Sequence, residues 1–159
     1  MVLKELSLTK FSFYIFCIFT FGCSHPKEDK AIHVFENIDV SKIPNDTIFG
    51  DNTSIKLQNG VYYFGSKPYS GFIIDVYETD TIKSVGSYFK GKQHGTTKTF
   101  FPNGKLETLR NYRNGIGYGQ HVGYWGNGNK KFDFVYFNDK REGIQKQWYE
   151  SGNQYYELS

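Results

Sequence analysis

Four glycines recur with a constant 24-residue period, and each is followed six positions later by an aromatic residue. The glycines are Gly71, Gly95, Gly119 and Gly143, and the aromatic residues are Tyr77, Phe101, Trp125 and Tyr149. Both columns would rarely fill together by chance, because the chain contains only 17 glycines and 19% aromatic residues. A fixed period of this length is typical of repeat proteins, so it constrains the fold more than any single motif does.

Turn dipeptides divide the same segment at alternating intervals of 11 and 13 positions, from Thr79-Asp80 to Ser151-Gly152. An Asn-Gly pair between apolar runs is a strong hairpin signal, because type I′ turns need positive φ at both central residues. We therefore expect positive φ at Gly104 and Gly115, each of which follows an asparagine. The candidate structural glycines of the turns are Gly104, Gly115, Gly128 and Gly152. They add to the four glycines of the 24-residue period, which we call the glycine ladder.

The runs between these turns are rich in aromatic residues and threonine, which favours pleated strands over helices. Strands of five to eight residues, two in each unit, fit between the turns. The sequence therefore predicts an all-β fold, an antiparallel β-hairpin repeat array with a 24-residue period, in the form of an elongated meander or solenoid. Two further columns keep the period and are expected to supply rings to a thin core: Val76, Phe100, Tyr124 and Trp148, and Tyr88, Tyr112 and Tyr136.

Residues 1–22 differ from the rest and are expected to be a signal peptide. Their apolar run, Phe11 to Gly22, is too short to span a bilayer of about 30 Å but has the length of a signal-peptide core. With Gly22 directly before Cys23, the segment resembles a bacterial lipoprotein leader. This resemblance implies cleavage before Cys23, lipidation of its thiol and anchoring in the cell envelope, at the outer membrane. A plain signal peptide is the alternative. Removal of the leader would leave no second thiol for a disulfide.

Residues 23–58 show no period and are expected to form a mostly irregular tether, with a short strand or turn docked on the array. Within it, Lys27-Glu28-Asp29 resembles a surface-export signal of lipoproteins, and a plain solvated tether is the alternative. The repeat domain is expected at 59–159. It begins with a shortened hairpin, in phase with the others, whose turn is Gly65-Ser66-Lys67-Pro68.

The second unit carries the most specific pattern. It contains Gly95, Phe100-Phe101, Asn103-Gly104-Lys105-Leu106, Tyr112, Asn114-Gly115 and Gly119. This pattern resembles the bacterial variant of the MORN repeat, and the resemblance extends over roughly residues 59–159. The first unit departs from it with Asp80 at a turn glycine, and the third with Lys130 at an apolar position and Asp139 at a glycine. The resemblance implies a β-hairpin fold without catalytic residues. Related proteins are often labelled antitoxin-like, a label that rests on fold alone.

No group of residues in the sequence indicates catalysis, a cofactor or a metal site. The histidines, His25, His33, His94 and His121, share no column and are expected to be exposed turn residues. A net charge of +3 with scattered basic residues argues against nucleic acid as a partner. We therefore expect a protein that is not an enzyme and uses no cofactor. The alternative of a small hydrolase ranks behind the two binding functions described next.

An aromatic surface is the remaining candidate for function. Aromatic pairs recur one unit apart, at Tyr124-Trp125 and Trp148-Tyr149. Because Tyr and Trp are enriched at protein interfaces, the first hypothesis is a membrane-anchored structural or interaction module with an unidentified partner protein. The second hypothesis is a module that binds glycan or cell wall by stacking sugars on these rings. The alternative to both is that the rings only build the core of the array.

Overall fold

The computed structural model describes residues 38–158, in which fourteen strands and no helix form two sheets. The large sheet contains β1 (Thr47–Phe49), β5 (Gly71–Val76), β6 (Ile82–Phe89), β7 (Lys92–Phe100), β8 (Leu106–Arg113), β9 (Ile116–Gly117), β10 (Gly119–Tyr124), β11 (Lys130–Phe137), β12 (Lys140–Arg141), β13 (Gln145–Trp148) and β14 (Gln154–Leu158). The small sheet contains β2 (Ile55–Gln58), β3 (Val61–Phe64) and β4 (Lys67–Pro68). The all-β prediction is confirmed. Cys23 and the leader lie outside the described residues.

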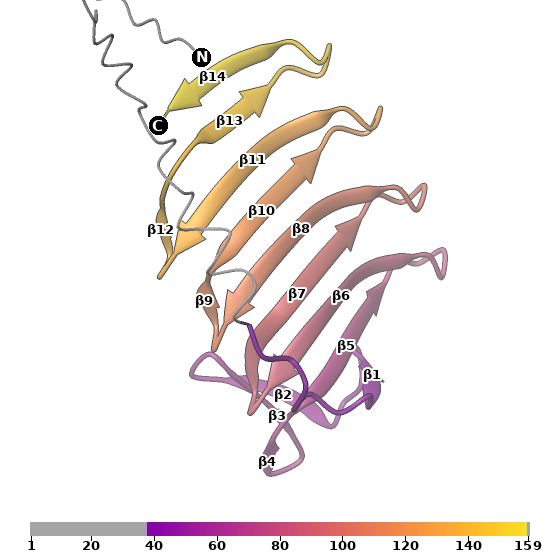
Figure 1. Ribbon diagram of the computed structural model, residues 1–159. Coiled ribbons are helices and arrows are strands. Elements are labelled where there is room, and N and C mark those ends of the chain that lie inside the picture. The colour runs from indigo at the N-terminus through magenta and orange to yellow at the C-terminus, as the bar shows by residue number, and fades with distance from the viewer. Residues whose placement is uncertain (1–37, 159) are drawn as a thin grey trace, which may run out of the picture.

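The strands of the large sheet lie side by side almost in chain order (Figure 1), as β1-β5-β6-β7-β8-β10-β11-β13-β14. The short strands β9 and β12 pair with β8 and β11. From β5 to β14 every pairing is antiparallel, but β1 pairs in parallel with β5, with Thr47 opposite Phe72. The sheet is therefore mixed, and the purely antiparallel prediction is wrong at β1, because a segment of the expected tether docks there.

Two kinds of turn alternate along the large sheet. One is a two-residue turn with positive φ at both residues, as at Asn114 (54°) and Gly115 (82°). The other is a longer turn with positive φ at Gly104 (78°), whose N–H donates to the Phe101 carbonyl oxygen at 2.8 Å. Positive φ is thus confirmed at Gly104 and Gly115. The type I′ geometry applies only to the first kind, because Asn103 does not have positive φ.

All eight predicted structural glycines have positive φ, between 66° and 142°. Three glycines of the ladder lie directly opposite a tyrosine on the neighbouring strand: Gly71 opposite Tyr88, Gly95 opposite Tyr112, and Gly119 opposite Tyr136. A glycine offers no side chain, so it leaves space where neighbouring groups approach the backbone. At Gly95 an added Cβ would lie 2.8 Å from Val40 and 2.9 Å from Ser87. The constant spacing between the glycine and tyrosine columns therefore corresponds to cross-strand pairs.

The small sheet contains the predicted hairpin, but its turn is only Gly65-Ser66. Lys67 and Pro68, which were expected in the turn, form β4. This hairpin pairs with β2 in a separate sheet, so it does not continue the large sheet as the later hairpins do. A buried cluster of Tyr69, Ile73 and Tyr88 packs beside Tyr62, whose ring meets that of Tyr88 edge-on at 4.9 Å. Aromatic rings therefore supply much of this core, and each buries a large apolar area.

Buried polar side chains connect the middle strands of the large sheet. Asn111 is 1% exposed; its Nδ2 donates to the Gln120 carbonyl oxygen at 2.6 Å, and its Oδ1 accepts from Thr96 at 2.8 Å. Each buried polar group must keep such partners, because an unpaired one costs about 1–3 kcal/mol.

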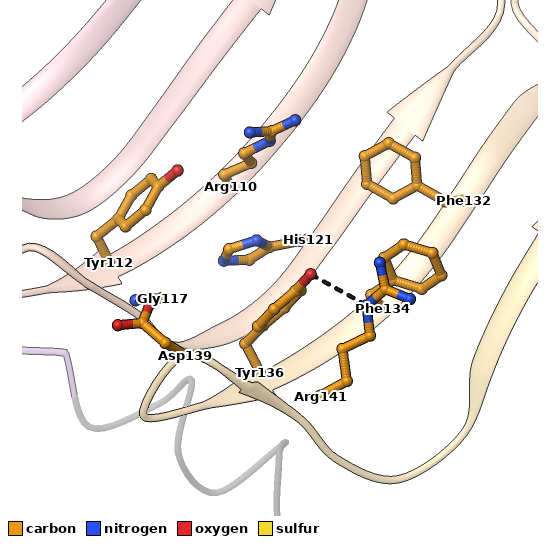
Figure 2. A pocket seen from close by; sticks show the side chains of 9 residues that line it. All are labelled: Arg110, Tyr112, Gly117, His121, Phe132, Phe134, Tyr136, Asp139 and Arg141. Carbon is orange, nitrogen blue, oxygen red and sulfur yellow. Dashed lines mark hydrogen bonds between the residues drawn. The ribbon is translucent and has the colours of Figure 1, made fainter. Parts of the chain in front are cut away.

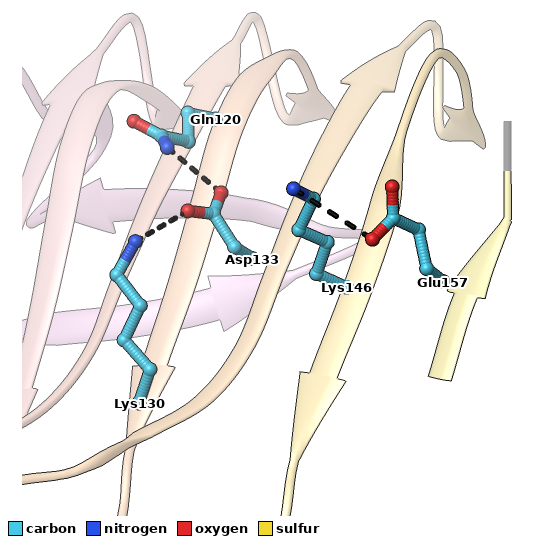
Figure 3. Close-up of polar contacts among 5 residues, drawn as sticks. All are labelled: Gln120, Lys130, Asp133, Lys146 and Glu157. Carbon is cyan, nitrogen blue, oxygen red and sulfur yellow. Dashed lines mark hydrogen bonds and ion pairs between the residues drawn. The ribbon is translucent and has the colours of Figure 1, made fainter. Parts of the chain in front are cut away.

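More exposed pairs also link neighbouring strands (Figure 3). The Asp133 carboxylate accepts a hydrogen bond from Gln120 on the neighbouring β10 and one from Lys130 on its own strand β11, both at 2.7 Å. Lys146 lies 3.8 Å from Glu157 across β13 and β14. Surface pairs of this kind contribute roughly 0–1 kcal/mol each, so the sheet does not depend on them.

Candidate functional site

The four aromatic residues predicted to form a binding surface lie at the ends of two neighbouring hairpins. Tyr124 ends β10 and Trp148 ends β13, and each is followed by its partner in the turn. The structure brings two of them together, because the indole Nε1 of Trp125 donates to the Trp148 carbonyl oxygen at 2.9 Å. Tyr124, Trp125 and Trp148 are half-buried, and Tyr149 is 57% exposed.

Lysine side chains lie over the two indole rings. The Lys131 ammonium is 4.3 Å from the centroid of the Trp125 ring, and that of Lys130 is 5.6 Å from the centroid of Trp148. Such cation–π contacts occupy one face of each ring. Tyr149 instead packs against Tyr155, with ring centroids 4.4 Å apart. The exposed part of the predicted surface is therefore Tyr149, which extends to Tyr155, rather than the tryptophans.

The exposed rings continue onto β14, the last strand in the order of the large sheet. Tyr155, Tyr156 and Leu158 are 48%, 37% and 57% exposed. Within the described residues β14 pairs only with β13. A strand with one unpaired edge is a template for a further strand, and natural sheets usually protect such edges with charge or a cover. Beside its three apolar residues, β14 has one charged residue, Glu157.

A cavity of about 380 Å³ lies over the middle of the large sheet, between β8 and β12 (Figure 2). Its lining residues are Arg110, Tyr112, Gly117, His121, Phe132, Phe134, Tyr136, Asp139 and Arg141. The sequence analysis did not predict this site. Its members come from separate strands and meet through strand register, for example His121 opposite Phe134. No local motif marks them.

The prediction of exposed turn histidines is wrong for two residues: His94 is half-buried within β7, and His121 is buried at 6% exposure. His121 lies inside β10, where its ring stacks on Tyr136 at 4.4 Å and tilts against Tyr112 at 5.6 Å. Its Nε2 is 2.8 Å from the Asn111 carbonyl oxygen, which can only accept, so Nε2 carries the hydrogen. Burial lowers the pKa of His121 below its ordinary value of 6.5, and the ring is neutral at pH 7.

The polar side chains of the cavity are held by the sheet. The Arg141 guanidinium lies 4.0 Å from the centroid of Phe134, and its Nε donates to the Tyr136 hydroxyl at 3.2 Å. The Asp139 carboxylate accepts a hydrogen bond from the Gly117 N–H at 2.6 Å. The ion pairs among the described residues are Lys130–Asp133 and Lys146–Glu157. Neither arginine of the cavity takes part in one.

Among residues 38–158, no three or more His, Cys, Asp or Glu side chains are arranged to hold a metal ion. In the same range, no helix has the length and apolar character needed to cross a membrane. Comparisons with protein-family models, with curated proteins and with solved structures find no match for this chain. The resemblance to MORN repeats stays a prediction from the sequence.

Proposed function

We propose that this chain is a non-catalytic interaction module of the bacterial envelope, anchored through lipid on Cys23, whose β-hairpin repeat presents a binding surface to a partner protein. The observation that carries the proposal is the exposed apolar edge at β14, where Tyr155, Tyr156 and Leu158 are accessible. The anchor rests on the leader, which combines a short apolar run with Gly22-Cys23.

Equivalent turn contacts support the 24-residue repeat. In four successive hairpins the turn aromatic donates its N–H to the carbonyl oxygen four positions later, at 2.8–2.9 Å. The donors are Tyr77, Phe101, Trp125 and Tyr149. The strand register also shifts at the same interval, between Asp75/Val76, Thr99/Phe100, Gly123/Tyr124 and Gln147/Trp148. An array of similar hairpins of this kind is what the resemblance to MORN repeats implies.

The occupant that best fits β14 is an extended segment of the partner protein. Such a segment would pair with the free backbone N–H and C=O groups of β14 and so continue the sheet. Its side chains would cover apolar groups on both faces, because Tyr155 and Tyr156 point to opposite sides of the sheet. Most of the binding energy is then expected from the tyrosines, which are common anchor residues at interfaces.

A photo-crosslinking experiment in intact cells tests this surface. A crosslinking amino acid at Leu158 should give one defined adduct, and the same amino acid at Leu57 should not. Leu57 is a matched control, because it is 59% exposed against 57% for Leu158 but lies in the small sheet. The substitution Leu158→Lys should abolish crosslinking from position 156, and Leu57→Lys should not. Equal labelling from both positions, or no adduct at all, would reject the β14 surface.

The lipid anchor is tested separately. Cells fed a radiolabelled fatty acid should label the wild-type chain and not Cys23→Ser, and only the wild type should sediment with membranes. A labelled Cys23→Ser variant would contradict the assignment.

The alternative function, binding of glycan or cell wall, needs ring faces that are free for sugars. Lys131 and Lys130 lie over Trp125 and Trp148, which leaves Tyr149 and Tyr155 as the more accessible rings. Titration of tryptophan fluorescence with peptidoglycan fragments and common glucans distinguishes this function from protein binding. A saturable change would favour the glycan alternative, and an unchanged spectrum would favour the partner protein.

A further inference from the structure

The cavity of Figure 2 contains more positive than negative charge. Arg110 and Arg141 line it from β8 and β12, and neither forms an ion pair within the described residues. Asp139 is the one carboxylate in the lining, and its Oδ1 is already hydrogen-bonded to the Gly117 N–H. With His121 neutral, the formal net charge of the lining is +1, which matches a monoanion.

Arg141 is held in one orientation. Its guanidinium stacks over the ring of Phe134 at 4.0 Å, and its Nε donates to the Tyr136 hydroxyl. The two terminal nitrogens have no partner among the described residues. A planar guanidinium fixed in this way presents two parallel N–H donors, which is the arrangement that binds a carboxylate.

A flat apolar wall lies beside the arginine. The rings of Phe132 and Phe134 are stacked, with centroids 4.9 Å apart and planes inclined by 19°. Phe132 lies over Gly123, where an added Cβ would collide with the ring. Because the Arg141 guanidinium already covers a face of Phe134, the ring of Phe132 is the part of this wall that suits a planar apolar group. Aromatic side chains favour stacked or edge-on contact with another ring.

We propose that this cavity binds a small organic acid with one carboxylate and a planar apolar body, the carboxylate on the arginines and the body against Phe132. A phosphate dianion fits less well, because its second charge would meet Asp139 in a lining of net charge +1. A neutral ring compound would leave both guanidinium groups without a counter-charge. The site lies on β8 to β12, apart from the β14 surface, so it does not depend on the function proposed above.

The test is an NMR titration of the purified full chain with four probes: benzoate, benzamide, acetate and inorganic phosphate. Benzoate should shift the amide signals of Gly117 and His121 in a saturable manner, with a dissociation constant in the millimolar range. Benzamide has the same shape without the charge, and acetate has the charge without the ring. Both should bind at least about tenfold more weakly. Phosphate binding tighter than benzoate would overturn the proposal, as would equal binding of benzamide.

Variants locate the site. Arg141→Gln and Arg110→Gln should each weaken benzoate binding at least about tenfold, because each removes a charged donor. Arg113→Gln is the matched control, since Arg113 is an exposed arginine on β8 that does not line the cavity. Arg141→Lys keeps the charge but loses the two-donor geometry, and it should also weaken binding. If Arg113→Gln weakens binding as much as Arg141→Gln, or if benzoate causes no saturable shift, the proposal is wrong.

Discussion

Replacing Gly104 by valine tests whether backbone geometry, rather than side-chain contact, holds a hairpin turn. Gly104 has φ 78°, and a Cβ added there would meet no atom within 4 Å. Any loss of stability must therefore arise because a β-branched residue is strained in the left-handed region. We expect Gly104→Val to lower the free energy of unfolding by about 1–3 kcal/mol, measured by urea unfolding.

The chain offers two matched controls. Gly126 also has open space around an added Cβ, but its φ lies outside the left-handed region, so Gly126→Val should change stability by less than about 1 kcal/mol. Asp80 occupies the position of Gly104 in the preceding unit and has φ 61°. Because Asp tolerates this conformation better than Val, Gly104→Asp should cost less than Gly104→Val.

Hydrogen exchange shows where the damage is felt. Gly104 connects β7 to β8, so amides in residues 96–113 should exchange faster in Gly104→Val before those around Tyr62, which lies in the small sheet. Faster exchange along the whole chain would refute the view that each hairpin depends mainly on its neighbours. Equal losses of stability in Gly104→Val and Gly126→Val would refute the view that strain at positive φ causes the loss in Gly104→Val.

Three further changes test the interior of the sheet. Gly95→Ala adds a crowded Cβ at φ 91°, and its cost in urea unfolding should be about 2–5 kcal/mol. Asn111→Ala leaves buried partners unpaired and should cost about 1–3 kcal/mol in the same assay. The pKa of His121 is lowered in the folded state, so the unfolded chain binds more protons below pH 6.5 and stability falls as pH decreases. His121→Gln should remove the part of the loss of stability at low pH that comes from His121. An unchanged pH dependence of stability in this variant would contradict the prediction.

The turns could be predicted from the sequence because their determinants are local. Positive φ at Gly104 and Gly115 follows from Asn-Gly pairs between apolar runs. The two aspartates that replace glycine in the repeat pattern, Asp80 and Asp139, also have positive φ, at 61° and 62°. Asp is one of the few residues other than glycine that adopts this conformation readily, so the departures in sequence preserve the backbone.

The cavity and the burial of His121 could not be predicted, because they depend on contacts between strands. A shift of one residue in register would move His121 to the other face of the sheet. The register is the one in which Gly119 pairs with Tyr136, and that pairing is evident only in the folded sheet. The parallel pairing of β1 with β5 is also a contact between segments that lie apart in the sequence. The isolated position of His121 in the sequence therefore led to the wrong prediction, an exposed turn in place of a buried strand.

The proposed repeat also explains why the cavity forms where it does. Tyr88, Tyr112 and Tyr136 keep one column constant, but the column of Arg110 begins with Gly86, one period earlier. In the same way Thr97 precedes His121 by one period, and Gly86 pairs with Thr97 across β6 and β7. That earlier pair has neither a cation nor an imidazole to offer a ligand. A framework of glycines and tyrosines can therefore stay fixed while a few positions between them change, and these positions give the strands from β8 to β12 a charged cavity.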